Sequence, residues 1–437
     1  MRLLFLFLLQ LLLSPLFSQE IKRGKEYDYA RRIVDTMCSQ SMHGRGYTNG
    51  GDSIAANYLR TEFQNFHLKS FSENYYQKLS FPVNTFPSNA IFMWEGLGEL
   101  LIGKDFIISP SSGSAQMLKQ LSKVSWLDSA TFYNPGKLKK FLEKKCPRAY
   151  VAVDIPKISE REVIAFFTKT KPGIRGLIFI KRNKLTADFE QQQDPFPSVE
   201  LLLHDNITLE KLKKKSLASI FYFNKLIPDH HSQNVIGYVE GSEHPDSFIV
   251  FSGHYDHIGE MGNALFPGAN DNASGCAMLL NLAKYYSLPE HKPKCSIVFM
   301  AFCGEEVGLL GSKYYTEHPL FPLKHIKFLL NMDIMGTGGD GITAVNGTLF
   351  TKEFEKLKQI NAENNLVKTV NIRGKAANSD HYFFSEKGVR AVFIYTMGGI
   401  KAYHDIYDRA ETLPLNEFEN LFKLIVKFGD YLQVTDN

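Results

Sequence analysis

The sequence predicts an α/β fold in which a mixed, mainly parallel sheet is sandwiched by helices and a mainly β accessory domain is inserted. From residue 234 onward, apolar runs alternate with amphipathic stretches, which is typical of a sheet covered on both faces. Polar clusters follow several of these runs directly, where open α/β sheets place their ligand sites. Between about residues 80 and 225, short apolar runs separated by turn clusters indicate a separate unit.

The first elements are expected in a helical region at residues 26–68. Asp52 or Ser53 can cap a helix whose apolar side chains share one face. These side chains are Ile54, Ala55, Tyr58, Leu59 and Phe63. The glycine-rich segment at 43–47 that precedes them is interpreted as a tight loop.

The remaining elements follow from apolar runs and helical periodicity. In the accessory region, strands are expected at 149–153, 176–180 and 217–223, and lysine-rich helix faces at 137–145 and 211–215. Farther along, strands are expected at 247–251, 295–302, 326–332 and 391–395, and helices at 273–286, 309–316, 350–364 and 415–432.

Composition limits the classes of function. The 437 residues suffice for two or three folding units, and a hydrophobic fraction of 44% is ordinary for a globular protein. The formal net charge of +4 is a weak bias, so no nucleic acid partner is expected. The five cysteines lack paired metal-ligand spacing and are interpreted as small buried hydrophobic residues, with their pairing left open.

The first residues have the pattern of a secretory signal peptide. Met1-Arg2 is followed by an almost unbroken apolar run over 3–13 and a plausible cleavage point near Ser18. The run is short for a bilayer span, although an uncleaved anchor is the alternative. We therefore expect residues 1–18 to be removed and the protein to be exported to the periplasm or the medium, without stable membrane insertion.

Five polar clusters, each next to an expected strand or helix, supply candidate metal ligands. The candidates are His254, Asp271, Glu306, Asp333 and His404. Imidazoles combined with carboxylates are a ligand set for zinc, or less selectively for cobalt or manganese. Each cluster alone also fits an ordinary polar turn, but five clusters in register with the ends of elements favour a metal site.

Two aspartates can orient the candidate histidines. His254 and Asp256 can converge because residues two apart in extended backbone face the same way. A metal-bound imidazole usually donates its other N–H to an acceptor of this kind. Asp408, four residues after His404, can act on that histidine in the same manner.

The acidic candidates allow a division of roles. Asp271 stands where a helix begins, so it is either an N-cap or a carboxylate shared by two cations. Glu305 and Glu306 point in different directions. One can therefore bind metal while the other reaches the attacking water.

Six segments, in this order, resemble the co-catalytic di-zinc aminopeptidase family, which contains bacterial leucyl and Streptomyces-type aminopeptidases. The segments are SGHYDHIG at 252–259, GANDNASG at 268–275, AFCGEEVGLLGS at 301–312, NMDIMG at 331–336, NSDHYFF at 378–384 and YHDIYD at 403–408. The resemblance covers roughly 230–437 and the helical start at 26–68. The middle region is similar to a protease-associated domain in its insertion position and in the segment KDFIISP at 104–110.

The resemblance implies two Zn²⁺ ions per chain. His254 and Asp333 would bind one ion, and Glu306 and His404 would bind the other. Asp271 would bridge the two ions.

The resemblance also implies residues that act around the metals. Glu305 would be the general base, Tyr403 would help to stabilise the oxyanion, and Asp256 would orient His254. Asn378 departs from relatives that have arginine before the SDH motif, which leaves the contacts to the substrate backbone open.

The expected organisation follows from the family. After a signal peptide at 1–18, a helical segment at 19–78 would pack on the zinc peptidase domain at 229–437. A protease-associated-like accessory domain would occupy 79–228.

The expected function is that of an exported zinc metallopeptidase. As an aminopeptidase, it would remove N-terminal residues from peptides or proteins with zinc-activated water and Glu305 as general base. The alternatives are a glutaminyl cyclase or carboxypeptidase of the same fold, or a non-catalytic receptor-like ectodomain. Metal stoichiometry and product analysis separate these alternatives, and side-chain preference and oligomeric state are left open.

Overall fold

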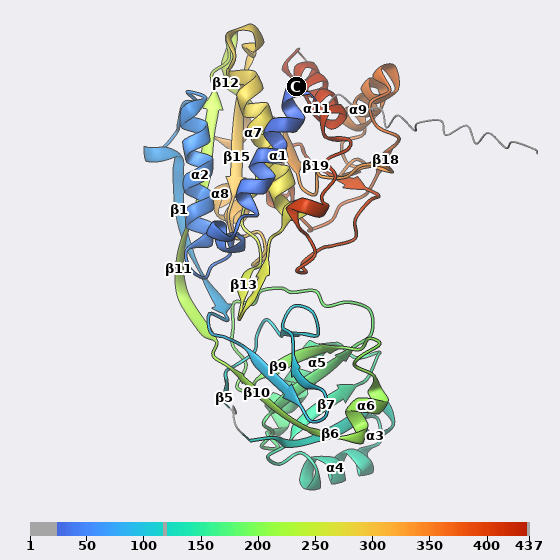
Figure 1. Cartoon of the computed structure of the whole chain (residues 1–437). Coiled ribbons are helices and arrows are strands. Elements are labelled where there is room, and N and C mark those ends of the chain that lie inside the picture. The colour runs from blue at the N-terminus through green and yellow to red at the C-terminus, as the bar shows by residue number, and fades with distance from the viewer. Residues whose placement is uncertain (1–23, 117–119, 435–437) are drawn as a thin grey trace, which may run out of the picture.

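Two units, each built around its own sheet, make up the part of the chain that the computed structural model describes, residues 24–116 and 120–434 (Figure 1). The eight-stranded unit lies above the nine-stranded unit in this view, and a hairpin of β13 (Gly259–Met261) and β14 (Ala264–Phe266) lies between them. The expected signal peptide at 1–18 lies outside the described residues. Within the described ranges, no helix is both long and apolar enough to cross a membrane.

The eight-stranded sheet has the strand order β1-β11-β15-β12-β16-β19-β17-β18. Its strands are β1 (Tyr76–Thr85), β11 (Lys225–Val239), β12 (His244–His254), β15 (Cys295–Phe302), β16 (Ile326–Met332), β17 (Gly341–Val345), β18 (Val370–Ile372) and β19 (Ala391–Met397). The neighbours β15, β12, β16 and β19 are parallel, whereas β11 pairs antiparallel with β1 and β15, and β17 pairs antiparallel with β19. The expected α/β class with a mixed sheet is confirmed.

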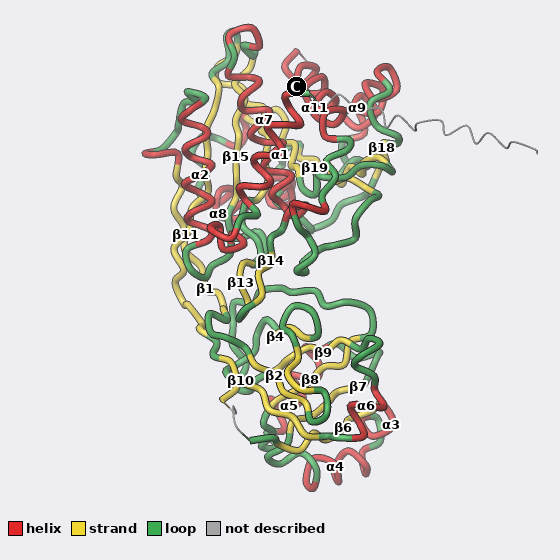
Figure 2. Tube along the Cα trace, in the orientation of Figure 1, coloured by secondary structure: helices red, strands yellow, loops and turns green. Residues whose placement is uncertain are grey.

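Helices cover both faces of this sheet (Figure 2). They are α1 (Lys25–Met37), α2 (Gly51–Asn65), α7 (Ser274–Ser287), α8 (Leu310–Glu317), α9 (Thr351–Asn364), α10 (His381–Glu386) and α11 (Phe418–Val434). Ile249 and Phe251 of β12 join the larger core, to which α1, α2, α7, α9 and α11 contribute, and Phe248 and Val250 join a smaller core with α8 and α10. Because both faces are covered, the eight residues of β15 are all buried.

The nine-stranded unit lies between β1 and β11 in the sequence. Its strands are β2 (Ile91–Trp94), β3 (Gly98–Leu100), β4 (Phe106–Ile108), β5 (Ala115–Gln116), β6 (Ser122–Asp128), β7 (Tyr150–Asp154), β8 (Gly176–Lys181), β9 (Ser198–Leu202) and β10 (Leu217–Tyr222). Its helices are α3 (Ser129–Phe132), α4 (Pro135–Lys144), α5 (Glu160–Thr170) and α6 (Leu209–Lys214). The expectation of a mainly β unit understates the helices, because the parallel neighbours β6, β7 and β8 need crossover connections, which α3, α4 and α5 supply.

Two local expectations need correction. Gly50 precedes α2 as its N-cap, and the Asp52 carboxylate instead accepts hydrogen bonds from His230 and Ser232, both at 2.8 Å. Ile54 does not join the buried face of α2, since its side chain is 38% exposed.

The cysteines are close to expectation. Four of them are buried, Cys38 is half-buried, and all five are free thiols.

Candidate metal centre

The five expected ligands converge at one edge of the eight-stranded sheet. His254 is the last residue of β12, Asp333 directly follows β16, and Glu306 lies four residues beyond β15. Asp271 precedes α7, and His404 lies in the loop after β19. The carboxyl ends of parallel strands meet at the same edge, so residues far apart in sequence come together here. All five side chains are buried.

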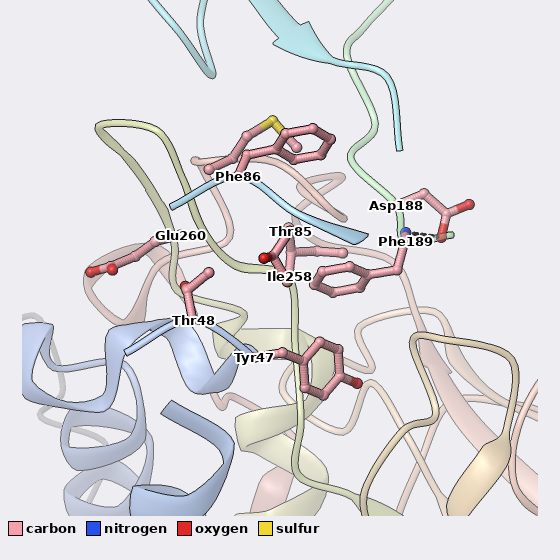
Figure 3. A pocket seen from close by; sticks show the side chains of 9 residues that line it. Tyr47, Thr48, Thr85, Phe86, Asp188, Phe189, Ile258 and Glu260 are labelled. Carbon is pink, nitrogen blue, oxygen red and sulfur yellow. Dashed lines mark hydrogen bonds between the residues drawn. The ribbon is translucent and has the colours of Figure 1, made fainter. Parts of the chain in front are cut away.

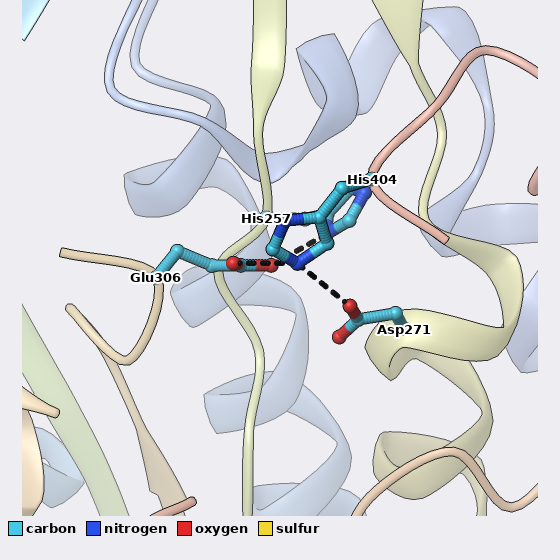
Figure 4. Close-up of side chains that lie close together, drawn as sticks. All are labelled: His257, Asp271, Glu306 and His404. Atoms are coloured by element: carbon cyan, nitrogen blue, oxygen red, sulfur yellow. Dashed lines mark hydrogen bonds and ion pairs between the residues drawn. The ribbon is translucent and has the colours of Figure 1, made fainter. Parts of the chain in front are cut away.

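The distances divide the ligands into two groups that share Asp271. Nε2 of His254 lies 3.3 Å from Asp271 Oδ1 and 3.4 Å from Asp333 Oδ1. Nε2 of His404 lies 3.0 Å from Asp271 Oδ2 and 3.0 Å from Glu306 Oε2. Figure 4 shows Asp271, Glu306 and His404 pointing toward one another. The two carboxylate oxygens of Asp271 therefore face two different histidines.

The donor atoms fit divalent metal ions. Ligand atoms of His254, Asp271 and Asp333 lie within 4.8 Å of one another, and a second group, which contains Asp271, Glu306 and His404, meets the same limit. Asp333 Oδ1 is buried without a hydrogen-bond partner among the described residues. Buried carboxylates are costly unless cations neutralise them, and imidazole with carboxylate is a zinc ligand set.

The ionisation of these groups is strongly coupled. Burial alone would lower the pKa of His254, but the carboxylates of Glu305 and Asp333 raise it well above its usual range. Burial also opposes the protonation of His404, whose pKa Glu306 and Asp271 raise well above its usual range. Burial would raise the pKa of Asp271, yet hydrogen bonds with the two imidazoles hold it well below its usual range. In the metal-free protein, protons on the imidazoles thus balance the carboxylate charge.

Asp256 lies beside His254, as expected. Nδ1 of His254 is 3.2 Å from the backbone oxygen of Asp256 and 3.8 Å from its Oδ1. The carboxylate also accepts hydrogen bonds from the Tyr47 hydroxyl and from the backbone N–H groups of Glu305 and Glu306, the latter two at 3.4 and 3.3 Å. It therefore connects the His254 strand to the loop that carries both glutamates.

Asp408 does not orient His404, contrary to expectation. The Asp408 carboxylate accepts hydrogen bonds from the backbone N–H groups of Asn270 and Asp271, at 2.9–3.0 Å. His404 has a φ of +51°, so the chain turns sharply and takes Asp408 to the Asp271 segment. Nδ1 of His404 instead lies 2.8 Å from the backbone oxygen of Ala187.

The two expected catalytic residues border the ligands. Glu305 is half-buried. One of its carboxylate oxygens lies within 4.8 Å of ligand atoms of His254 and Glu306. Tyr403 is 42% exposed, and its ring stacks on His404 with centroids 4.0 Å apart. Asn378 is exposed, and the next residue, Ser379, donates to Asp333 Oδ2 at 3.3 Å.

The comparisons with known proteins agree with this geometry. Residues 234–429 match the sequence pattern described as peptidase family M28. This segment belongs to peptidase family M28.

Sequence relatives cover only part of the chain. A probable zinc metalloprotease of Pyrenophora teres f. teres is 39% identical over 116 residues, which is 25% of this chain and 24% of that protein. The aminopeptidase YwaD of Bacillus subtilis is 29% identical over 247 residues, 54% of this chain and 49% of YwaD. The chain thus spans about half or less of the length of these relatives.

Two solved structures share the fold over nearly the whole chain. BSAP, a zinc aminopeptidase from Bacillus subtilis, matches with a TM-score of 0.66 at 17% identity. The match covers 92% of this chain and 94% of the BSAP chain. The aminopeptidase from Aneurinibacillus sp. strain AM-1 matches with a TM-score of 0.63 at 19% identity, over 93% of each chain. The likeness in fold therefore includes the nine-stranded unit.

Arg45, outside the M28 segment, was missed because its flanking glycines suggested a tight loop. Its guanidinium is fully buried and donates hydrogen bonds to backbone oxygens on both sides of the site. The acceptors are Tyr255 at 2.8 Å, Met37 at 2.9 Å, Pro267 at 2.7 Å, Gly268 at 2.7 Å and Asp271 at 3.3 Å. Arg45 therefore ties the His254 strand to the Asp271 segment.

His257 was also missed, although it lies within the M28 motif at 252–259. It is fully buried, and its Nδ1 lies 2.7 Å from Glu306 Oε1. Its ring lies beside Glu306 and His404 in Figure 4. Its position in this motif, three residues after His254, could have indicated that it lies near the metal ligands.

Replacing Arg45 with Met is expected to lower the free energy of unfolding by at least about 3 kcal/mol, because each buried carbonyl left without a donor costs about 1–3 kcal/mol. Chemical denaturation of the metal-free protein measures this change. Arg32→Met removes an exposed guanidinium and is the matched control, with an expected change within about 0.5 kcal/mol. Equal effects of the two substitutions would contradict the role of Arg45.

Binding of Zn²⁺ to the metal-free M28 site is expected to release protons and to weaken as the pH falls. Below the raised imidazole pKa values of His254 and His404, each incoming ion must displace a proton. Because the two imidazoles bind protons more tightly in the folded state, they stabilise the metal-free fold at pH values below the usual histidine pKa. That stabilisation is lost as the pH rises through the raised pKa values. Calorimetric titration in two buffers of different ionisation enthalpy measures the released protons. A binding heat independent of the buffer would contradict the expectation.

Proposed function

We propose that this protein is an exported di-zinc metallopeptidase that removes N-terminal residues from peptides. The observation that carries the proposal is the position of Asp271, whose two oxygens face His254 and His404 in separate ligand groups. The printed names of the relatives, zinc metalloprotease and aminopeptidase, support zinc and peptide substrates. The signal-peptide pattern at 1–18 supports export.

The five ligands divide between two ions. His254 and Asp333 would hold one ion, Glu306 and His404 would hold the other, and Asp271 would be shared by both. Bound zinc would polarise the scissile carbonyl and lower the pKa of the attacking water. The retained set of five ligands argues against a receptor-like protein that has lost catalysis.

Glu305 moves the proton. Its carboxylate takes a proton from the attacking water and delivers it to the leaving amine as the C–N bond breaks. Burial raises its pKa well above the usual range in the metal-free protein, with neighbouring carboxylates adding to the effect and His254 opposing it.

Tyr403 and Asp256 support the reaction. Partial burial and the nearby carboxylates raise the pKa of Tyr403 above its usual range, so its phenol remains protonated and can donate to the developing oxyanion. Asp256 orients His254 because its backbone oxygen accepts a hydrogen bond from the Nδ1–H of that histidine. The Asp256 carboxylate also accepts from the backbone N–H groups of Glu305 and Glu306 and so fixes their positions. Each residue thus has a role that the geometry supports.

We further propose the domain division for this function. The N-terminal segment at 19–78, of which the structure describes 24–78, would pack on the peptidase domain at 229–437, and residues 79–228, which begin inside β1 and end inside β11, would form a protease-associated-like accessory domain. The presence of two separate sheets, with the nine-stranded one lying between β1 and β11 in the sequence, supports this division.

Glu305→Gln is expected to lower turnover of a peptide substrate by roughly 10²–10⁴-fold, because the amide cannot accept the proton. Zinc content should remain at the wild-type level, since Glu305 is not a ligand in this account. Turnover assays and elemental analysis of the same sample measure both quantities. Wild-type turnover in the variant would overturn the assignment of the base.

Peptides with a free N-terminus are expected to be cleaved at least about 100-fold faster than their N-acetylated forms, because acetylation removes the charge that acidic groups near the metals bind. Mass spectrometry of parallel digests identifies the products and their rates. Equal rates for the two forms would contradict the aminopeptidase assignment and leave the metallopeptidase assignment intact. A cyclised N-terminal product would favour the glutaminyl cyclase alternative.

A further inference from the structure

A segment of the nine-stranded unit reaches the candidate metal centre. It lies between β8 and β9, and we call residues 184–191 the strap. Figure 3 shows Asp188 and Phe189 of the strap beside Tyr47 and Ile258 of the eight-stranded unit. The Phe189 ring lies 4.8 Å from the ring of Tyr47, whose hydroxyl donates to Asp256. The strap therefore lies against residues that support the ligands.

One end of the strap binds the loop that carries His404. The Nδ1–H of His404 donates to the backbone oxygen of Ala187 at 2.8 Å, and the N–H of Ala187 donates to the backbone oxygen of His404 at 2.9 Å. The Lys184 ammonium donates to the backbone oxygen of Tyr403 at 2.8 Å and lies 3.2 Å from Asp405 Oδ2. Residues on both sides of His404 are thus held by the strap.

The other end binds the loop that carries Glu306. Nε2 of Gln191 donates to the backbone oxygen of Val307 at 3.0 Å. The backbone oxygen of Glu190 accepts from the N–H of Asn84 in β1 at 2.9 Å. Both ends of the strap are therefore anchored on the eight-stranded unit, each beside a ligand of the same proposed ion.

The contact with Ala187 determines how His404 can act. In the neutral ring, which is the form that binds metal, an Nδ1–H that donates to a carbonyl fixes the tautomer and leaves the lone pair on Nε2. Nε2 is the atom that faces Asp271 and Glu306. The strap thus aims His404 at the space between these two carboxylates.

We propose that the strap is a positioning element for one of the two metal ions, so that the nine-stranded unit sets the affinity of the ion held by Glu306 and His404. This inference rests on the proposed function. The Ala187 carbonyl acts through His404, and Lys184 and Gln191 keep it in place. Lys184 and Gln191 form hydrogen bonds with the loops that carry His404 and Glu306, so removing these two side chains leaves the packing of Phe189 on Tyr47, and with it the Asp256–His254 side, in place.

The test removes the two side-chain anchors in the full-length protein with Lys184→Met combined with Gln191→Leu. Arg182→Met is the matched control, because Arg182 precedes the strap and pairs with Asp154 inside the nine-stranded unit. Stepwise Zn²⁺ affinities are measured by competition with a chromophoric chelator, and the Co²⁺ absorption spectrum reports ligand geometry. In the double variant, one ion is expected to bind about 10–100-fold more weakly, with a changed Co²⁺ spectrum, while the other retains its affinity within about threefold. The control is expected to match the wild type.

Unfolding of the metal-free proteins, followed by circular dichroism, shows whether each variant folds. If the double variant is unfolded, the single variants Lys184→Met and Gln191→Leu provide the same comparison, with a smaller expected loss at the same ion. Wild-type affinity for both ions, or equal weakening of both, would overturn the role of the strap and leave the proposed function standing. A wild-type protein that binds no zinc would overturn the proposed function and this inference together.

Discussion

The carboxylate of Asp271 faces two buried histidines at once, and the arrangement of the whole site depends on keeping it there. Three kinds of contact hold the Asp271 segment. Asp408 accepts from the backbone N–H groups of Asn270 and Asp271, and Arg45 donates to the backbone oxygen of Asp271. Helix α7 begins at Ser274, and most of its residues are buried in the larger core. The residue shared by both ligand groups is therefore held by contacts to its backbone that do not occupy its two carboxylate oxygens.

Charge balance is the second constraint. Asp271, Glu306 and Asp333 are buried side by side, and Asp380 lies close enough to Asp333 for the two carboxyl groups to interact. Burial raises the pKa of Asp380 to about 7, so this carboxyl shares in the protonation of the cluster near neutral pH. Ionised carboxylates in such a place require cations, which protonated imidazoles supply in the metal-free protein and metal ions supply when bound. Folding, protonation and metal binding are thus linked at one edge of the sheet.

The convergence of the candidate ligands could be predicted from the sequence because each follows an apolar strand or opens a helix, and the ends of parallel strands meet at one edge. The contacts that support these residues could not be predicted from the sequence. Asp408 was expected near His404 from its spacing, but the left-handed backbone at His404 sends it to Asp271. The partner of His404 is the backbone oxygen of Ala187, 217 residues away, and a carbonyl has no signature in sequence. Arg45 was hidden for a similar reason, since all five of its acceptors are backbone oxygens.

The central claim is that Asp271 is shared by two zinc ions. Anomalous X-ray scattering at the zinc absorption edge, from crystals of the zinc-loaded full-length protein, tests it most directly. The account predicts two peaks flanking the Asp271 carboxylate, one beside His254 and Asp333 and the other beside Glu306 and His404. A single peak, or two peaks of which either lies out of contact with Asp271, would contradict it.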